Sequence, residues 1–162
     1  LNQDDHLLNL LNGTFDLGTQ TLREHSPGDN LTQIANVAFD PQADCPAWKK
    51  TLGLIFDQDQ SLIAYVQQLL GYSVSGESGE AILPIAYGSG ANGKSTLWNT
   101  IAELLGDYAF LAPESLLLGS SNSHPTERAS LYQKRFVAIS EPEQDCKFKE
   151  ELSSQFQTMI DG

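Results

Sequence analysis

The sequence predicts an α/β fold, and three observations in its second half carry that prediction. A short apolar run at 81–87 has the length of a buried strand. A glycine-rich loop follows it directly and leads into a stretch whose apolar residues recur at helical spacing. A second compact apolar run lies at 136–139, with acidic residues immediately after it. Strand, loop, helix and a further strand in this order are typical of an α/β unit.

The glycine-rich loop fits the pattern G-x-x-x-x-G-K-[ST], which starts at Gly88 and ends at Ser95. Glycine keeps side chains away from a phosphate and lets successive backbone N–H groups turn toward the anion. Lys94 supplies a mobile positive charge for the terminal phosphates, and the Ser95 hydroxyl suits hydrated Mg²⁺. The alternative is a glycine–serine surface turn beside a solvated lysine. We favour binding of a nucleoside triphosphate such as ATP, with Mg²⁺, by Gly88, Ser89, Gly90, Ala91, Asn92, Gly93, Lys94, Ser95 and Thr96.

The sequence on both sides of this loop supports the phosphate-binding interpretation. The run at 81–87 predicts the strand that enters the loop, with an irregularity near Pro84 because proline lacks a ladder donor. After the loop, a helix is expected to end at Gly106. Its apolar residues are Leu97, Ile101, Leu104, Leu105 and Tyr108.

The first 40 residues predict a small β-meander without a catalytic constellation. The dipeptides Asn12-Gly13 and Gly18-Thr19 are turn signals between three short strand candidates. A further turn at 26–29 precedes a loosely alternating strand over 31–39.

Two helices are expected next, followed by a boundary. The first begins at Pro46, and the second has Asp59 or Asp57 as its cap and Gly71 as its end. The polar, glycine-rich stretch 73–80 is the candidate for a domain boundary, or for a loop just before the strand that enters the glycine-rich loop. It divides a β-rich and then helical region, 1–75, from a phosphate-loop domain, 76–162.

The apolar run 136–139 predicts a second buried strand, beside the strand that enters the loop. Glu141 and Glu143 follow at its carboxyl end, which is the edge where ligands bind in open α/β sheets. A carboxylate there can hold Mg²⁺ or orient the water that attacks the γ-phosphate. The alternative is that both carboxylates only solvate a strand end. Short elements are also expected at Tyr108–Ala112 (a strand), from Pro113 to Leu118 and from Pro125 to Tyr132 (helices).

Composition and charge narrow the possible partners. The 162 residues carry a net charge of −12, with 3 basic and 11 acidic residues in 1–80. No basic cluster large enough for tight binding of nucleic acid exists here. No apolar run is long enough to cross a membrane, and the two distant cysteines suggest no disulfide framework, so we expect a cytoplasmic protein. The missing initial methionine and the unfinished amphipathic stretch at the end suggest a piece of a longer polypeptide.

Several motifs together resemble a known family. They are the loop at 88–96, Leu-Leu-Gly-Asp-Tyr at 104–108, Lys-Arg-Phe-Val-Ala-Ile-Ser-Glu-Pro-Glu at 134–143 and the stretches 12–17 and 34–41. In their order along the chain, these motifs resemble superfamily 3 helicases, and most of all the phage/plasmid primase–helicase family, which includes a poxvirus branch. The resemblance covers nearly the whole chain.

This resemblance implies an AAA+-like P-loop ATPase that assembles as a ring, usually a homo-hexamer, and translocates on DNA. The loop would be the Walker A site, with Lys94 catalytic, and Ser140-Glu141 would end the Walker B strand. Ser140 departs from the aspartate common there, so Glu141 is left as magnesium ligand, general base or both. The family's sensor asparagine, DNA-binding hairpin and arginine finger would follow residue 162, so we expect weak hydrolysis, no unwinding and DNA contacts only through other parts of the protein.

Two other classes of function were considered. A small-molecule P-loop kinase would share the loop but needs a lid with several arginines, and the chain has only Arg23, Arg128 and Arg135. An inactive, prophage-derived interaction module would keep the fold without the chemistry. The intact Lys94 and Ser95 of the loop argue against such a loss of function. Nucleotide affinity separates the module from the enzymes, and acceptor screening separates the kinase.

Overall fold

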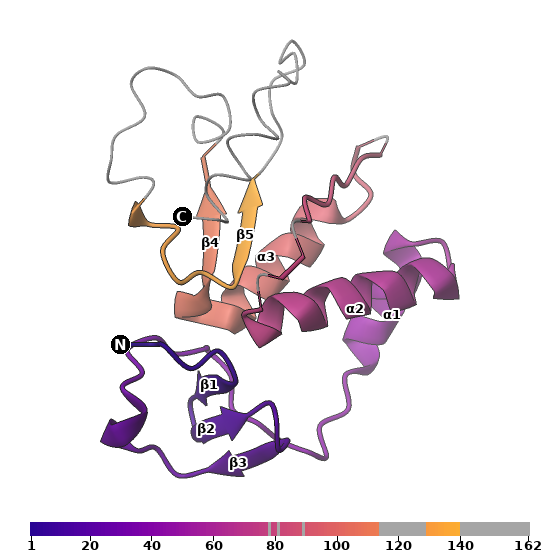
Figure 1. The fold of residues 1–162 in the computed structure, drawn as a ribbon. Coiled ribbons are helices and arrows are strands. Elements are labelled where there is room, and N and C mark those ends of the chain that lie inside the picture. The colour runs from indigo at the N-terminus through magenta and orange to yellow at the C-terminus, as the bar shows by residue number, and fades with distance from the viewer. Residues whose placement is uncertain (78, 81, 89, 114–128, 140–162) are drawn as a thin grey trace, which may run out of the picture.

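The structure is a computed structural model that describes residues 1–77, 79–80, 82–88, 90–113 and 129–139. These residues form a mixed α/β fold with two small sheets and three α-helices (Figure 1). The elements are β1 (Leu7–Leu10), β2 (Gly13–Asp16), β3 (Thr21–Arg23), the 3₁₀ turn η1 (Pro27–Asp29), α1 (Pro46–Ile55), α2 (Gln60–Ser75), α3 (Lys94–Leu105), the 3₁₀ turn η2 (Gly106–Tyr108), β4 (Ala109–Ala112) and β5 (Phe136–Ile139). None of the helices in the described residues is both long and apolar enough to span a membrane.

The predicted meander at the N-terminus is confirmed. Strands β1, β2 and β3 form an antiparallel sheet in chain order. Leu10 pairs with Gly13, so the Asn12-Gly13 signal marks the first turn. In the second turn the Asp16 carboxylate accepts hydrogen bonds from the backbone N–H groups of Gly18 and Thr19, both at 2.9 Å.

The prediction of a strand over 31–39 is wrong, because no strand forms there. This segment divides its backbone hydrogen bonds between two neighbours instead of forming a ladder. Ala35 N–H donates to Asn9 of β1, at 2.9 Å, while Asn36 N–H donates to the Leu104 carbonyl at the end of α3, at 3.0 Å. The segment therefore links the N-terminal sheet to the C-terminus of α3.

Helices α1 and α2 form as expected at their starts. Pro46 occupies the first turn of α1, and the Asp59 carboxylate caps α2 by accepting from the N–H groups of Ser61 and Leu62. The predicted end at Gly71 is wrong, because α2 continues to Ser75 and ends at Gly76 in the left-handed conformation (φ 73°). Gly71 is exposed and has nothing within 4 Å of the position that a Cβ would take, so no contact requires a glycine there, and the helix continues through it at a small cost.

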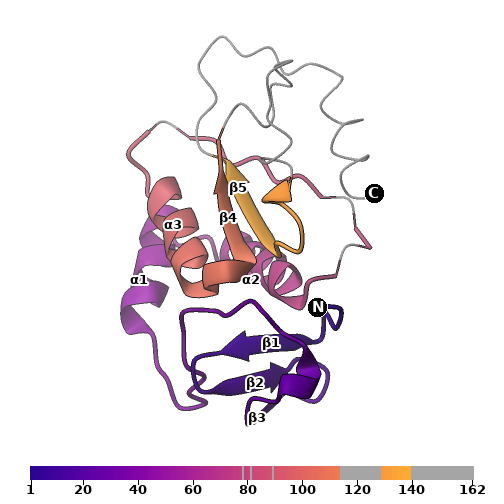
Figure 2. The ribbon, with the colours of Figure 1, turned by 90° about the vertical axis from the view of Figure 1, so that its left-hand side faces the viewer.

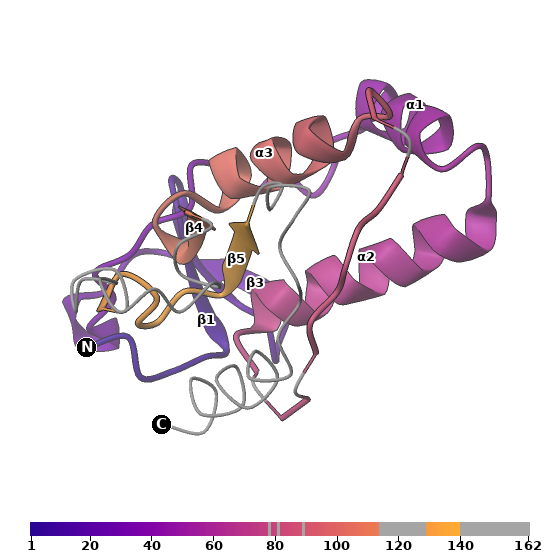
Figure 3. The same ribbon diagram turned by 90° about the horizontal axis from the view of Figure 1, so that it is seen from above.

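The strand expected at 81–87 is not present in the described residues 82–87. These residues run back from the end of α2 to the start of α3 without a strand partner (Figure 3). Ile82, Leu83, Ile85 and Tyr87 are all at least 44% exposed. A strand needs a hydrogen-bonding partner, and Pro84 removes one donor from this segment. Strand β5 pairs with β4, and no pairing between β5 and 82–87 is found in the described residues, so the predicted neighbourhood of these two segments is not shown.

Strands β4 and β5 are confirmed, and they pair in parallel from Ala109↔Phe136 to Ala112↔Ile139. Helix α3 leads through η2 into β4, so it runs back along the strand pair. The carboxyl ends of both strands therefore lie toward the end of the unit at which α3 begins (Figures 1 and 2).

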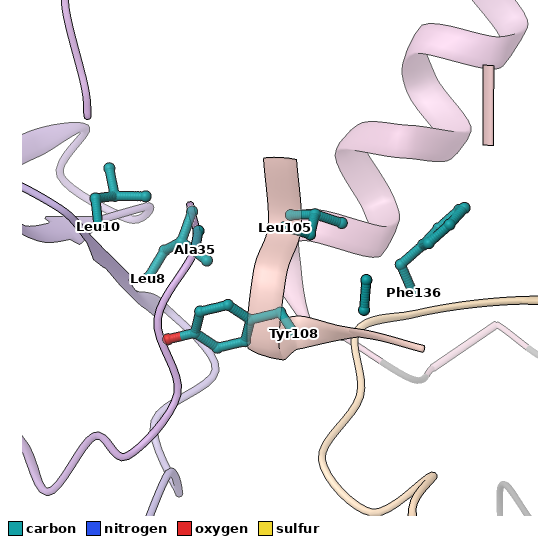
Figure 4. Close-up of a cluster of buried hydrophobic side chains, with 7 residues drawn as sticks. Leu8, Leu10, Ala35, Leu105, Tyr108 and Phe136 are labelled. Atoms are coloured by element: carbon teal, nitrogen blue, oxygen red, sulfur yellow. The ribbon is translucent and has the colours of Figure 1, made fainter. Parts of the chain in front are cut away.

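Two clusters of apolar side chains hold these elements together. The larger joins Leu8, Leu10 and Ala35 of the N-terminal region to Leu105, Tyr108, Ala109 and Phe136 (Figure 4). The smaller joins α1, α2 and α3 through Leu52, Val66 and Leu97. Leu70 and Trp98 contact both clusters. The N-terminal sheet thus packs directly on the unit that follows the loop.

Candidate phosphate-binding loop

The candidate loop connects the extended segment 82–88 to the first turn of α3. Gly93 is the N-cap of α3 in the left-handed conformation (φ 84°, ψ 3°), and no side chain caps the helix. The first backbone N–H groups of α3 are therefore not taken by a cap, and the positive end of the helix dipole is at Lys94. Ser95 and Thr96 are exposed in this turn. A helix start of this kind favours anions.

The ammonium group of Lys94 lies back over the loop. Its Nζ donates a hydrogen bond to the Asn92 side-chain oxygen at 2.7 Å. Asn92 Nδ2 occupies the position that a Cβ on Gly88 would need, and Lys94 Nζ lies 3.5 Å from that position. The first glycine of the pattern, the Asn92 amide and the lysine charge therefore meet at one point, which only a residue without a side chain at 88 permits.

Helix α1 supports the loop from the other side. A Cβ on Gly93 would lie 2.6 Å from Cγ1 of Ile55, the last residue of α1. Gly93 thus combines a positive φ with a close approach, and both require glycine. The contact fixes the start of α3 against α1.

The acidic half of the predicted site lies outside the described residues. Glu141, Glu143 and Ser140 all fall there, as does Ser89 of the loop. Strand β5 is described up to Ile139, and its carboxyl end points toward the end of the unit where α3 begins. The roles predicted for Glu141 and Glu143 stay predictions.

A pocket among the described residues lies away from the loop. It has a volume of about 410 Å³ and lies in the N-terminal region. Its lining includes the carboxylates of Asp4, Asp16 and Asp29 and the guanidinium of Arg23. Phosphate carries negative charge, so this lining disfavours it, and the loop stays the better candidate for a phosphate site.

Two features of the site were not anticipated from the sequence. Asn92 was expected as one of the nucleotide-binding loop residues, and its side chain proves to be the hydrogen-bond partner of Lys94. Ile55 was not expected at the site, yet it contacts Gly93. The spacing of Asn92 and Lys94, two residues apart, was a usable signal for the first. No local signal links Ile55 to a glycine so far along the chain.

The described molecule is thus a mixed α/β protein with a candidate loop of the phosphate-binding type. Residues 1–57 match the family model described as "D5 N terminal like". The whole chain is similar to "Putative helicase L207/L206" of Acanthamoeba polyphaga mimivirus, with 27% identity over 165 residues. The chain spans 17% of the length of that relative. Both similarities support the primase–helicase resemblance predicted from the sequence, whereas the superfamily 3 and poxvirus-branch assignments stay predictions.

Proposed function

We propose that this chain is the ATP-binding part of a replicative DNA primase–helicase, working in phage or plasmid replication. The observation that carries the proposal is the geometry at the start of α3, where an uncapped helix follows a glycine-rich loop and Lys94 lies over Gly88. The similarity of the whole chain to a protein named as a helicase supports the same function.

The groups at the loop fit a triphosphate with Mg²⁺ by their chemistry. Phosphate oxygens need N–H donors and positive charge, and the start of α3 offers backbone N–H groups, the helix dipole and Lys94. Magnesium needs oxygen ligands, and Ser95 offers an exposed hydroxyl. The Asn92 amide and the Lys94 ammonium group can lie against Gly88 because that residue has no Cβ.

Each residue has a separate task in this proposal. The N–H groups from Gly90 to Thr96 hold the phosphate chain, and Lys94 neutralises its terminal charge. Ser95 contributes an oxygen to Mg²⁺, and Glu141 either binds that ion through water or orients a water molecule. When bound, Mg²⁺ would neutralise charge on the terminal phosphates. Ile55 keeps the loop in place through its contact with Gly93.

Titration calorimetry of ATP with Mg²⁺ into the wild-type chain and Lys94→Ala tests the proposal. We expect binding by the wild type and a loss of at least tenfold in affinity in the variant, because one positioned charge on phosphate is worth about 1.5–3 kcal/mol.

The matched control is Lys49→Ala. Lys49 is an exposed lysine on α1 whose ion pair is with Asp44 (2.7 Å), so its removal leaves ATP affinity unchanged. Wild-type protein that does not bind ATP, or Lys94→Ala that binds equally well, would contradict the proposal.

DNA and the homo-hexameric ring belong to the proposal for the whole protein. The net charge of −12 disfavours tight contact between this chain and a phosphate backbone, so DNA would be held elsewhere in the protein. Sedimentation of a longer polypeptide with and without ATP tests the hexamer.

A further inference from the structure

We propose that Asn92 is a positioning residue that holds the Lys94 ammonium group ready for the terminal phosphates, an inference that rests on the function proposed above. Its side-chain oxygen accepts from Lys94 Nζ at 2.7 Å, and its nitrogen lies against Gly88. The amide thus spans the loop from its first glycine to its lysine.

The energetic reason lies in the freedom of lysine. A lysine side chain has four rotatable bonds, and fixing it on a ligand costs up to about 2 kcal/mol of rotamer entropy. The hydrogen bond to Asn92 pays part of this cost before the ligand arrives. Asn92 is itself only partly exposed, and its amide nitrogen lies close against Gly88.

The neutral charge of Asn92 matters as much as its position. An ammonium group has three donors, so one bond to Asn92 leaves two for phosphate oxygens. An amide oxygen orients the group without cancelling its charge. A carboxylate at the same place would pair with Lys94 and repel the phosphates, although its shape is nearly the same.

Other roles of the Asn92 amide predict other effects of its removal on nucleotide affinity. If the amide competed with phosphate for Lys94, its removal would free the lysine and tighten ATP binding. If the amide only kept the loop folded, its removal would weaken all nucleotides equally. Positioning predicts weaker binding that is greatest for ATP, because lysine in this pattern reaches the terminal phosphates.

The experiment is calorimetric titration of ATP and ADP, each with Mg²⁺, into wild type, Asn92→Ala, Asn92→Asp and Lys94→Ala. Asn92→Ala is expected to bind ATP about 3- to 10-fold more weakly than the wild type, the range of one lost hydrogen bond, with a smaller effect on ADP. Asn92→Asp is expected to lose more ATP affinity than Asn92→Ala. The matched control is Asn99→Ala, an exposed asparagine on α3, which is expected to bind as the wild type does.

Each remaining outcome has one meaning. Asn92→Ala that binds ATP as tightly as Asn99→Ala or more tightly, or that weakens ATP and ADP by the same factor, overturns the positioning role. So does Asn92→Asp that binds at least as well as Asn92→Ala. In these cases the loss of binding in Lys94→Ala still upholds the proposed function. A wild type that binds neither nucleotide overturns the proposed function, and the role of Asn92 with it.

Discussion

Arg135 joins three parts of the molecule through a single side chain. Its guanidinium donates to the Leu7 carbonyl of β1 at 2.7 Å and to the Val74 carbonyl of α2 at 2.8 Å. It also lies 4.8 Å from the centre of the Tyr108 ring, a cation–π contact. Burial lowers the pKa of Arg135, which remains a cation at any ordinary pH.

Replacing Arg135 by leucine is expected to lower the free energy of unfolding by about 2–4 kcal/mol. The change removes two charge-assisted hydrogen bonds and leaves two carbonyl groups without this donor. Urea denaturation followed by circular dichroism measures it. Lys49→Leu is the control, because that side chain is exposed and its midpoint should not move. Equal midpoints for both variants would contradict the role of Arg135.

The carboxyl of Asp29 makes the stability of the N-terminal region depend on pH. Arg23 donates to both of its oxygens at 2.7 Å, and this pairing holds the pKa of Asp29 below its ordinary value of 3.8. The folded state therefore gains stability above the unfolded pKa and loses it as the pH falls through the folded pKa. We expect the thermal midpoint of Asp29→Asn to change less than that of the wild type below about pH 4. Thermal midpoints of the two proteins that fall in parallel as the pH is lowered would contradict the contribution of Asp29.

At the scale of single elements, the junction between α3 and the 31–39 segment depends on Gly106. Gly106 has φ 53°, and a Cβ there would lie 2.7 Å from the Ile34 carbonyl oxygen. Ile34 and Asn36 come this close because they bond to the end of α3, at Asp107 N–H (3.0 Å) and the Leu104 carbonyl (3.0 Å). Gly106→Ala is therefore expected to destabilise the protein by about 1–3 kcal/mol, through backbone strain and this contact.

The same substitution at Gly71, Gly71→Ala, is expected to stabilise the protein instead. Gly71 lies within α2, with nothing within 4 Å of the position a Cβ would take. Alanine there stabilises a helix by about 0.5–1 kcal/mol, because glycine loses more backbone entropy on folding. Chemical denaturation of both variants compares them directly. Two changes of the same sign would show that the contact at Gly106 is not what decides stability.

The elements that the sequence predicted well are those specified by neighbouring residues. Turn dipeptides define β1 to β3, and Pro46 and Asp59 define the starts of α1 and α2. The errors concern partners far along the chain. Alternation over 31–39 cannot reveal that Asn36 bonds to the end of α3, and the apolar run 82–87 cannot reveal whether a neighbouring strand pairs with it.

For the candidate site as well, the sequence predicted the local features and missed a contact between distant segments. The loop pattern predicted the glycines, Lys94 and the helix that follows, all of which lie within one short stretch. It did not predict the Ile55 contact, which depends on how α1 packs on α3. The acidic residues Glu141 and Glu143 lie outside the described residues, so their approach to the loop stays a prediction.

At the scale of the whole molecule, the shared core joins the N-terminal sheet to the unit that carries the loop. Leu8, Leu10 and Ala35 pack in one cluster with Leu105, Tyr108 and Phe136 (Figure 4). The Tyr108 hydroxyl adds polar links, accepting from Asn9 N–H at 3.0 Å and donating to the Gln33 carbonyl at 3.3 Å. The predicted division at residue 75 and this shared core lead to different expectations for unfolding.

A substitution that creates a cavity in the N-terminal sheet distinguishes these two expectations for unfolding. Leu10 is 4% exposed, so Leu10→Ala is expected to cost about 2–5 kcal/mol. If the shared core makes one cooperative unit, native-state hydrogen exchange accelerates at the amides of β4 and the end of α3 as well as at β1. Leu54→Ala, at a leucine that is 71% exposed, is the matched control and leaves exchange unchanged. Acceleration that stays within residues 1–75 and does not reach β4 or the end of α3 would contradict the coupling, and it is the result that an independent region 1–75 requires. We expect the coupled result, because Leu10 and Tyr108 belong to the same buried cluster and a cavity at one weakens the packing of the other.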